Sequence, residues 1–254
     1  MASGIAHRLH TCHLTRIVMS DIPIPIAVRR NVAFCEAVFE GTMEVEGVRA
    51  DLIRDVSELK DVWGRNRIGV IVDSEGAFLD ELRPDVVIDA IMAKRPESSI
   101  KRQDSFSIGV GPGFSAPDRA DAVVESNRGH DLGRVIWQGE AEPYSGVPGL
   151  TAGYTRERVL RAPHEGTVRT VKTIGDMVKK DDIILYVDQT PVLARIDGVL
   201  RGLIRPIAVP SGEKLGDVDP RGIKGNCYTI SEKARAIAGG VLEAIMHRFN
   251  VECG

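Results

Sequence analysis

Short runs of apolar residues, each followed by polar residues, mark the first 150 positions of the chain. Runs of this kind read as buried strands and occur at Ile68–Asp73, Asp85–Met92, Phe106–Val110 and Ala122–Val124. Apolar residues at helical spacing occur at Met1–Leu14, at 26–40 and at Val56–Trp63. Buried strands that alternate with helices are typical of a mostly parallel sheet. The pattern predicts an α/β fold with a Rossmann-like, mostly parallel sheet domain over residues 1–150.

The order of elements at the N-terminus matches the later parts of a dinucleotide-binding βαβ unit. A predicted helix over Met1–Leu14 is followed by a predicted strand over Thr15–Ser20 and then by Asp21. In such a unit the acid binds a ribose hydroxyl, and a first strand with a glycine-rich turn precedes the helix. We therefore expect the domain to be N-terminally truncated and the native product to begin upstream of Met1. The alternative is a helix that caps a different sheet.

Residues 159–222 carry a glycine pattern that the first part of the chain lacks. It consists of Gly166-Thr-Val168 and Gly175-Asp-Met-Val178, then Gly198-Val-Leu200 and Gly216-Asp-Val218. Two such halves resemble the small all-β barrel-sandwich fold of biotinyl and lipoyl domains, which present a modifiable lysine in the hairpin between halves. The corresponding hairpin, Val187–Pro191, contains no lysine. We expect a barrel-sandwich hybrid domain that carries neither biotin nor lipoate, with a generic small barrel as the alternative.

The last stretch, 223–254, contains one clear helix. Ser231 suits its N-terminal cap, and apolar residues recur at helical spacing from Ala234 to Met246. Gly239 and Gly240 each cost a helix about 1 kcal/mol relative to alanine, which indicates close approach to another backbone. We expect this helix to pack back on the α/β domain, and the glycine- and proline-rich residues 135–158 to connect the two domains.

Composition and charge exclude several classes of protein. The 254 residues are 43% hydrophobic and 27% charged, with a formal net charge of -3. A nucleic-acid-binding domain would be basic, and no apolar run is long enough for a membrane span. Scattered cysteines favour reduced thiols and a cytoplasmic protein; they are Cys12, Cys35, Cys227 and Cys253. His7, His10, Cys12 and His13 do not share one helix face, so we expect no metal site.

Two predicted strands end in loops that suit an anionic ligand. After Phe106–Val110, glycines allow the backbone to approach a ligand closely; after Ala122–Val124, donor side chains gather. The predicted cofactor-binding residues are Gly109, Gly111, Gly113, Asn127, Arg128, His130 and Arg134, together with Asp21. The loops would form one pocket for a small phosphorylated ligand, because arginine binds phosphate in a bidentate manner. The alternative is two tight turns with solvated charges.

Cys227 is the candidate catalytic residue. It lies in a glycine-flanked loop just before the predicted helix from Ser231. A thiol near a helix N-terminus has a lowered pKa and is reactive. The alternative is a half-buried structural thiol.

Several segments together resemble the accessory proteins of the selenium-dependent molybdenum hydroxylase system. They are Arg29–Gly41 with Val45–Val48, Ile108–Ser115, Glu125–Ile136 and Cys227–Glu243. The run Asn127-Arg-Gly-His-Asp-Leu-Gly-Arg134 is the most specific of them.

The resemblance implies a role in maturation, insertion or activation of a molybdenum-cofactor hydroxylase. The implied ligand is a molybdopterin-type cofactor or an NAD-like nucleotide, and the implied partner is the hydroxylase client, with a homo-oligomer allowed. A second class stays open, namely an enzyme that is a nucleotide-dependent oxidoreductase or a sulfur or selenium transferase.

Overall fold

The structure is a computed structural model that describes residues 1–92, 99–144 and 146–250. Contacts within the chain form two compact units, each assembled from stretches that are separate in the sequence. The first unit comprises Met1–Pro23, Gly47–Ser145 and Ile230–Gly254, and the second comprises Ile24–Glu46 and Gly146–Thr229. Residues 24–46 therefore belong with the second unit, although they lie in the N-terminal part of the sequence.

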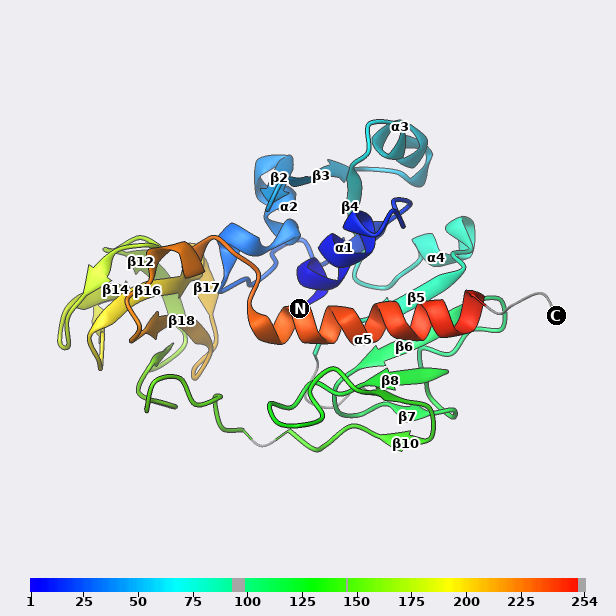
Figure 1. The fold of residues 1–254 in the computed structure, drawn as a ribbon. Helices are drawn as coiled ribbons and strands as arrows, with labels where there is room; N and C mark the ends of the chain where they lie inside the picture. Colours follow the sequence, from blue (N-terminus) through cyan, green and yellow to red (C-terminus); the bar gives the residue numbers. More distant parts are fainter. Residues whose placement is uncertain (93–98, 145, 251–254) are drawn as a thin grey trace. The chain divides into compact units, whose positions relative to one another are not determined.

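The first unit combines short strands with helices (Figure 1). Its helices are α1 (Ala2–Thr11), η3 (Val56–Glu58), α3 (Leu59–Gly64), α4 (Phe78–Leu82) and α5 (Glu232–Phe249). Its strands are β1 (Val18–Asp21), β3 (Val48–Ile53), β4 (Ile68–Val72), β5 (Val86–Asp89), β6 (Phe106–Val110), β7 (Ser115–Ala116), β8 (Ala122–Val124), β9 (Val135–Ile136) and β10 (Gly139–Glu140). β4 pairs in parallel with β1 and β3, and β6 pairs in parallel with β5 and β8.

The prediction of a Rossmann-like domain with one mostly parallel sheet is wrong. The parallel strands fall into two different sheets, with β1 and β5 each the outermost strand of its own sheet. β9 adds an antiparallel edge to β8, and β7 pairs only with β10. The unit is therefore mixed α/β with several small sheets. Buried apolar runs predict strands correctly, but they do not specify which strands exchange hydrogen bonds.

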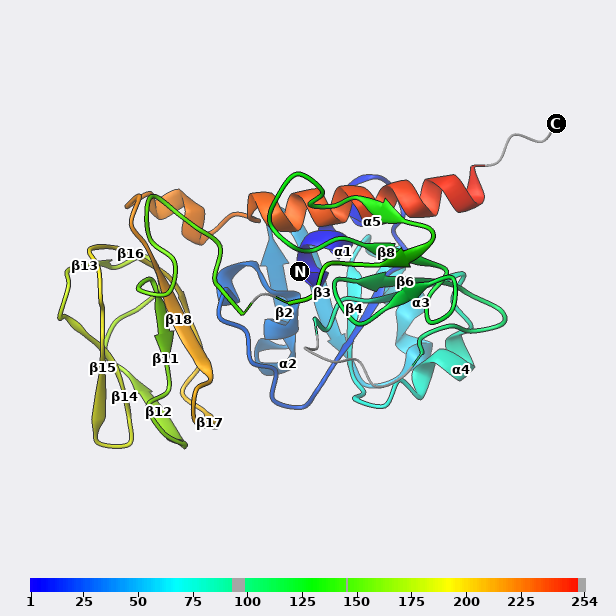
Figure 2. The same ribbon diagram turned by 90° about the horizontal axis from the view of Figure 1, so that it is seen from below.

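One apolar core joins the two longest helices of the first unit to the β6 sheet. Helix α5 lies along α1 and across β6 and β8, as both ribbon views show (Figures 1 and 2). Ile237 and Val241 of α5 are buried with Ile5 of α1, Ile108 of β6 and Val124 of β8. The N-terminal cap of α5 is the predicted one, because the hydroxyl of Ser231 accepts a hydrogen bond from the backbone N–H of Ala234.

The second unit is built largely from antiparallel strands. Its N-terminal part holds η1 (Arg30–Val32), η2 (Phe34–Glu36), α2 (Ala37–Glu40) and β2 (Thr42–Val45). The later strands are β11 (Val159–Arg161), β12 (Gly166–Thr170), β13 (Met177–Val178), β14 (Ile183–Val187), β15 (Thr190–Leu193), β16 (Gly198–Leu203), β17 (Ala208–Val209) and β18 (Lys214–Asp219), followed by η4 (Lys224–Cys227).

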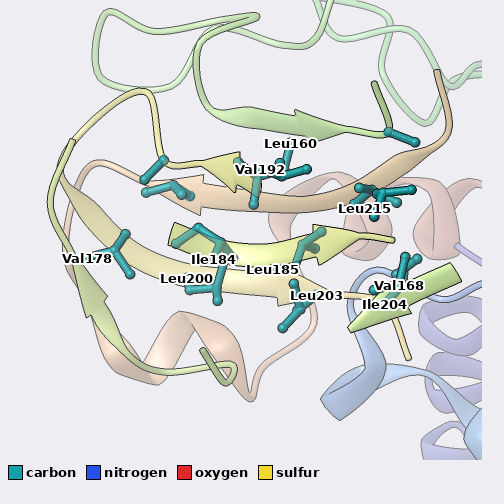
Figure 3. Packing of buried hydrophobic residues seen from close by; sticks show 14 of the residues in the cluster. Leu160, Val168, Val178, Ile184, Leu185, Val192, Leu200, Leu203, Ile204 and Leu215 are labelled. Carbon is teal, nitrogen blue, oxygen red and sulfur yellow. The ribbon is translucent and has the colours of Figure 1, made fainter. Parts of the chain in front are cut away.

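The prediction of a barrel-sandwich domain over residues 159–222 is also wrong. The strands form two separate four-stranded sheets, in the orders β11-β18-β16-β13 and β15-β14-β12-β17. The outermost strands of one sheet form no ladder with the outermost strands of the other. The strands described for this segment therefore do not close into a barrel. Leucine, isoleucine and valine side chains from both sheets fill the space between them, as Figure 3 shows for Leu160, Ile184, Leu200 and Leu215.

The single helix expected over residues 26–40 is absent. Two 3-10 turns and the four-residue helix α2 replace it, because tertiary contacts hold this segment in another conformation. Arg29 donates through Nη2 to the carbonyls of Asn226 and Thr229, at 2.7 and 2.8 Å. Arg30 donates through Nε to the carbonyl of Leu203 at 2.8 Å. Both guanidinium groups thus bind backbone carbonyls of the same unit.

Among the helices of residues 1–92, 99–144 and 146–250, none is both long and apolar enough to cross a membrane. Within the same residues, no group of three or more His, Cys, Asp or Glu side chains is placed to hold a metal ion.

Candidate functional site

The carboxyl ends of β6 and β8 lie side by side and form the rim of the candidate site. Val110 is the register partner of Val124, and the backbone N–H of Gly111 donates to the carbonyl of Val124 at 2.9 Å. The two loops that the sequence placed in one pocket therefore start from adjacent strand ends. The amide of Gly111 is engaged within the protein and is not directed at a ligand.

Packing within the protein explains why glycine occupies two of the predicted binding positions, 109 and 111. A Cβ on Gly109 would overlap the ring of Phe114, and a Cβ on Gly111 would lie 2.5 Å from Oγ of Ser126. Gly111 also has a φ of +83°, which favours glycine. Gly113, with a φ of +98°, completes the turn. These glycines shape the rim, and their contact with a ligand stays a prediction.

Glu125 organises the loop that follows β8. Its side chain is buried, with 3% of the residue exposed, and its two oxygens accept hydrogen bonds from backbone N–H groups. The donors are Asn127 at 2.5 Å and Glu142 at 2.7 Å. The side-chain amide of Asn127 donates to the carboxylate of Glu142. Asn127 thus connects Glu125 and Glu142 through its backbone N–H and its side-chain amide.

The first turn of α5 carries Glu232, which pairs with Arg128, and the half-buried Lys233. Arg128 forms an ion pair with Glu232 in which the side chains are 35% and 71% exposed. Burial lowers the pKa of the half-buried Lys233, the nearby charge of Arg128 lowers it further, and Glu125 opposes them. Arg128 and Lys233 thus place two positive charges near the start of α5, of which Arg128 is paired with Glu232.

A cavity of about 410 Å³ lies against the segment that follows β8. Its lining consists of Glu125, Asp131, Arg134, Val135, Ile136, Trp137, Gln138, Glu140 and Glu142. Two aromatic side chains of the same unit fix the position of Trp137. Its ring stacks on Phe106, and its ring centroid lies 4.4 Å from that of His247. The cavity therefore offers several hydrogen-bond acceptors and one aromatic wall, and Glu125 is common to the cavity and to the neighbourhood of Lys233.

The remaining predicted residues occupy different places in the first unit. Arg134 lines the cavity and forms an ion pair with Asp131 at 3.2 Å, while His130 is exposed in the same loop. Asp21 lies in the other parallel sheet, at the end of β1, where its Oδ1 accepts a hydrogen bond from the N–H of Ile22 at 2.8 Å. The structure thus brings Gly111, Asn127, Arg128 and Arg134 into one region and leaves Asp21 in a different sheet.

Cys227 belongs to the second unit and lies in the 3-10 turn η4. The thiol is buried and its Sγ lies 3.8 Å from the carbonyl of Leu200. The expected lowering of its pKa is wrong, because burial raises the pKa of the Cys227 thiol although Arg29 and Arg201 act in the opposite direction. The catalytic role of Cys227 stays a prediction.

Sequence reasoning missed Glu125, Lys233 and Trp137 as site residues. Glu125 could have been recognised, because its carboxylate comes directly after the buried run Ala122–Val124, at the end of a predicted strand. Lys233 carried no such signal, since a lysine in the first turn of a helix normally faces solvent. Its position beside Arg128 depends on the docking of α5 against the loop after β8.

Comparison with known proteins gives one curated relative and several solved structures. No family model matches the chain. The chain is 43% identical over 247 residues to the uncharacterized protein YqeB of Escherichia coli (strain K12). The match covers 97% of this chain and 46% of that protein, so the chain spans about half the length of the curated relative it matches.

Two solved structures illustrate the structural matches. A succinylglutamate desuccinylase/aspartoacylase from Rhodobacter sphaeroides is 21% identical with a TM-score of 0.23, over 24% of this chain and 21% of that one. The ectoine utilization protein EutE (DoeB) from Ruegeria pomeroyi is 20% identical with a TM-score of 0.24, over 33% and 28% of the two chains. Similarities this low do not define the fold of the whole chain.

These findings overturn the family resemblance drawn from the sequence. No family model matches the chain, and the curated relative is described only as an uncharacterized protein. The expected membership in the selenium-dependent molybdenum hydroxylase accessory family is therefore wrong. The same correction applies to the maturation role and to the alternative oxidoreductase and transferase roles.

Proposed function

We propose that the first unit binds a small phosphorylated ligand of the nucleotide class at the carboxyl ends of β6 and β8. The observation that supports this proposal is the meeting of the carboxyl ends of β6 and β8, where the loop after β8 carries Arg128 and lines a cavity through Glu125 and Arg134. Ligands of open α/β sheets bind outside the carboxyl ends of parallel strands, which is the position of this rim.

Positive charge at the rim lies on Arg128 and Lys233, outside the acid-lined cavity, and there it favours an anion. A phosphate group between Arg128 and Lys233 would offset their mutual repulsion and accept charge-assisted hydrogen bonds. The present partner of Arg128 is the exposed carboxylate of Glu232. An exposed ion pair of this kind contributes about 1 kcal/mol or less, so a phosphate can take the place of Glu232 at small cost.

The cavity suits the remainder of such a ligand. Glu140 and Glu142 present carboxylates that accept hydrogen bonds from hydroxyl or amino groups. Trp137 provides an aromatic surface for a planar ring. A volume of about 410 Å³ lies within the range of small-molecule sites.

Arg128→Ala is expected to weaken binding of ADP or pyrophosphate by roughly tenfold to a hundredfold, because it removes a charge-assisted hydrogen bond. Isothermal titration calorimetry on the full chain measures this change. The matched control is Arg102→Ala, since the Arg102–Asp80 pair of the same unit has side chains of similar exposure, 37% and 81%. Equal affinities of the Arg128→Ala protein and the unaltered protein would contradict the proposal.

The affinity for ADP is expected to fall with rising pH at values below those at which an ordinary lysine loses its proton. Lys233 is cationic below its lowered pKa, so its contribution is present at lower pH and is lost as the pH rises through that pKa. The charge of ADP is constant above about pH 7.5, which isolates the lysine. Calorimetry on Lys233→Met should give a weaker, pH-independent affinity over the same range. If the ADP affinities of both proteins changed with pH in the same way, Lys233 would be excluded as the group that causes the pH dependence.

A further inference from the structure

A hydroxyl, an imidazole and a carboxylate are aligned at the hairpin that joins β14 to β15 in the second unit. Nε2 of His164 lies 2.9 Å from Oγ1 of Thr190, and Nδ1 of His164 lies 2.6 Å from the carbonyl oxygen of Glu165. A carbonyl only accepts hydrogen bonds, so in the neutral imidazole the proton is on Nδ1. Nε2 is then the acceptor, and the hydroxyl of Thr190 donates to it.

The carboxylate of Asp188 lies near Nδ1 of the same ring, beyond hydrogen-bond distance. Its Oδ2 lies 4.0 Å from Nδ1 of His164, and its Oδ1 accepts a hydrogen bond from the backbone N–H of Thr167 at 2.9 Å. A Cβ on Gly166 would overlap this carboxylate, so the position of Asp188 depends on a glycine there. A carboxylate beside the imidazole is a feature of acyl-transfer sites.

The hydroxyl of Thr190 is exposed to solvent, on a hairpin that is anchored in the core of the unit. Thr190 and Asp188 are exposed, whereas Val187 and Val192 on the adjoining strands are buried in the core of the unit. A solvent-exposed hydrogen bond such as that between His164 and Thr190 contributes little to stability. The fold of the hairpin is already held by the ladder between β14 and β15 and by the backbone N–H of Asp188, which donates to the carbonyl of Thr167.

We propose that Thr190 is a nucleophile that accepts an acyl group from an activated ester or thioester, with His164 as its general base. Oγ1 of Thr190 attacks the acyl carbon while its proton passes to Nε2 of His164. The bond from the acyl carbon to the leaving oxygen or sulfur breaks, and the leaving group takes the proton from His164. The product is an ester of Thr190, and no oxidant or reductant takes part. As in acyl-transfer sites, the nucleophile hydrogen-bonds to its base; the carboxylate of Asp188 lies near the ring without a hydrogen bond to Nδ1, which binds the carbonyl of Glu165 instead.

p-Nitrophenyl acetate tests this proposal on the full chain. Trypsin cleavage after Lys180 and Arg195 releases Thr190 in one peptide, and cleavage after Arg161 and Arg169 releases Thr167 in another. Thr167 is an internal control, because it is exposed and its hydroxyl forms none of the contacts described for Thr190. Tandem mass spectrometry should find acetyl on Thr190 at least tenfold more often than on Thr167, since general base catalysis contributes on the order of 10² or more.

Variants of the three side chains separate a nucleophile from a simple hydrogen bond. His164→Gln keeps an acceptor for Thr190 but cannot take its proton, so the preference for Thr190 should disappear. Asp188→Asn should reduce the labelling rate severalfold, and Thr190→Ser should retain it. Far-UV circular dichroism establishes that each variant is folded. Equal labelling of Thr190 and Thr167, or full labelling of Thr190 in the His164→Gln protein, would overturn the proposal.

Discussion

Gly240→Ala is expected to lower the free energy of unfolding of the first unit by about 3 kcal/mol or more. Gly240 lies in the middle of α5, where an added Cβ would overlap the carbonyl oxygen of Gly133 and lie 2.9 Å from Cγ1 of Val124. A backbone carbonyl cannot rotate aside as the end of a side chain can, so α5 would have to move away from β8. Overpacking of this kind costs about 1–3 kcal/mol and occasionally more. Urea unfolding followed by tryptophan fluorescence measures the change, because Trp63 and Trp137 both belong to this unit.

The neighbouring glycine provides the matched control. A Cβ on Gly239 meets nothing within 4 Å. Alanine is the better helix former by about 1 kcal/mol, so Gly239→Ala should raise the free energy of unfolding by about that amount. The two substitutions are chemically identical and one position apart, yet opposite effects are expected. Effects of the same sign and similar size would show that α5 does not dock on Gly133 as described.

Asp217→Asn is expected to destabilise the second unit by about 3–5 kcal/mol at neutral pH. Asp217 is 2% exposed and forms ion pairs with Arg158 at 3.0 Å, with Arg201 at 2.8 Å and with Lys214 at 3.9 Å. Removal of the carboxylate leaves the buried Arg158 without this partner, while Arg201 keeps Asp219 at 3.4 Å, and breaking a buried ion pair costs about this much. Neither tryptophan belongs to this unit, so far-UV circular dichroism during urea unfolding is the measurement.

The same substitution should remove a contribution that depends on pH. Burial would raise the pKa of Asp217, but Lys214, Arg201 and Arg158 outweigh it and lower the pKa from 3.8 to about 2. A carboxyl with a depressed pKa stabilises the folded state above its unfolded pKa, here by about 2 kcal/mol, and that contribution is lost as the pH falls through the folded pKa. The difference in unfolding free energy between Asp217→Asn and the unaltered protein should therefore narrow as the pH falls from about 4 toward 2.

A second aspartate of the same unit controls for the loss of a charge as such. Asp181 is exposed and has a φ of +72°, a conformation that asparagine tolerates well. Asp181→Asn should change the free energy of unfolding by less than about 0.5 kcal/mol. If Asp181→Asn and Asp217→Asn destabilise the protein equally, net charge and not the buried ion pairs accounts for the effect.

Part of the candidate site was predictable because it depends on local sequence. Strand runs that end in Gly111 and in Glu125 identify two loops, and parallel strands bring such loops to one edge of a sheet. The sequence does not reveal which acceptors the hydrogen-bond donors of those loops bind. Arg128 pairs with Glu232, a residue 104 positions away, and the amide of Asn127 binds Glu142. Charges of opposite sign are common along the chain, and folding alone selects which of them meet.

By itself the sequence determined where the strands β6 and β8, the helix α5 and its cap at Ser231 form. These features depend on the spacing of apolar residues and on side chains that bind their own backbone a few positions away. Only the tertiary structure decided that the parallel strands divide into two sheets and that Lys233 joins Arg128. It also placed His164 between Thr190 and Asp188. Contacts of this second kind join residues far apart in the chain, where many alternative partners satisfy the same local pattern and only the packing of the whole unit selects one.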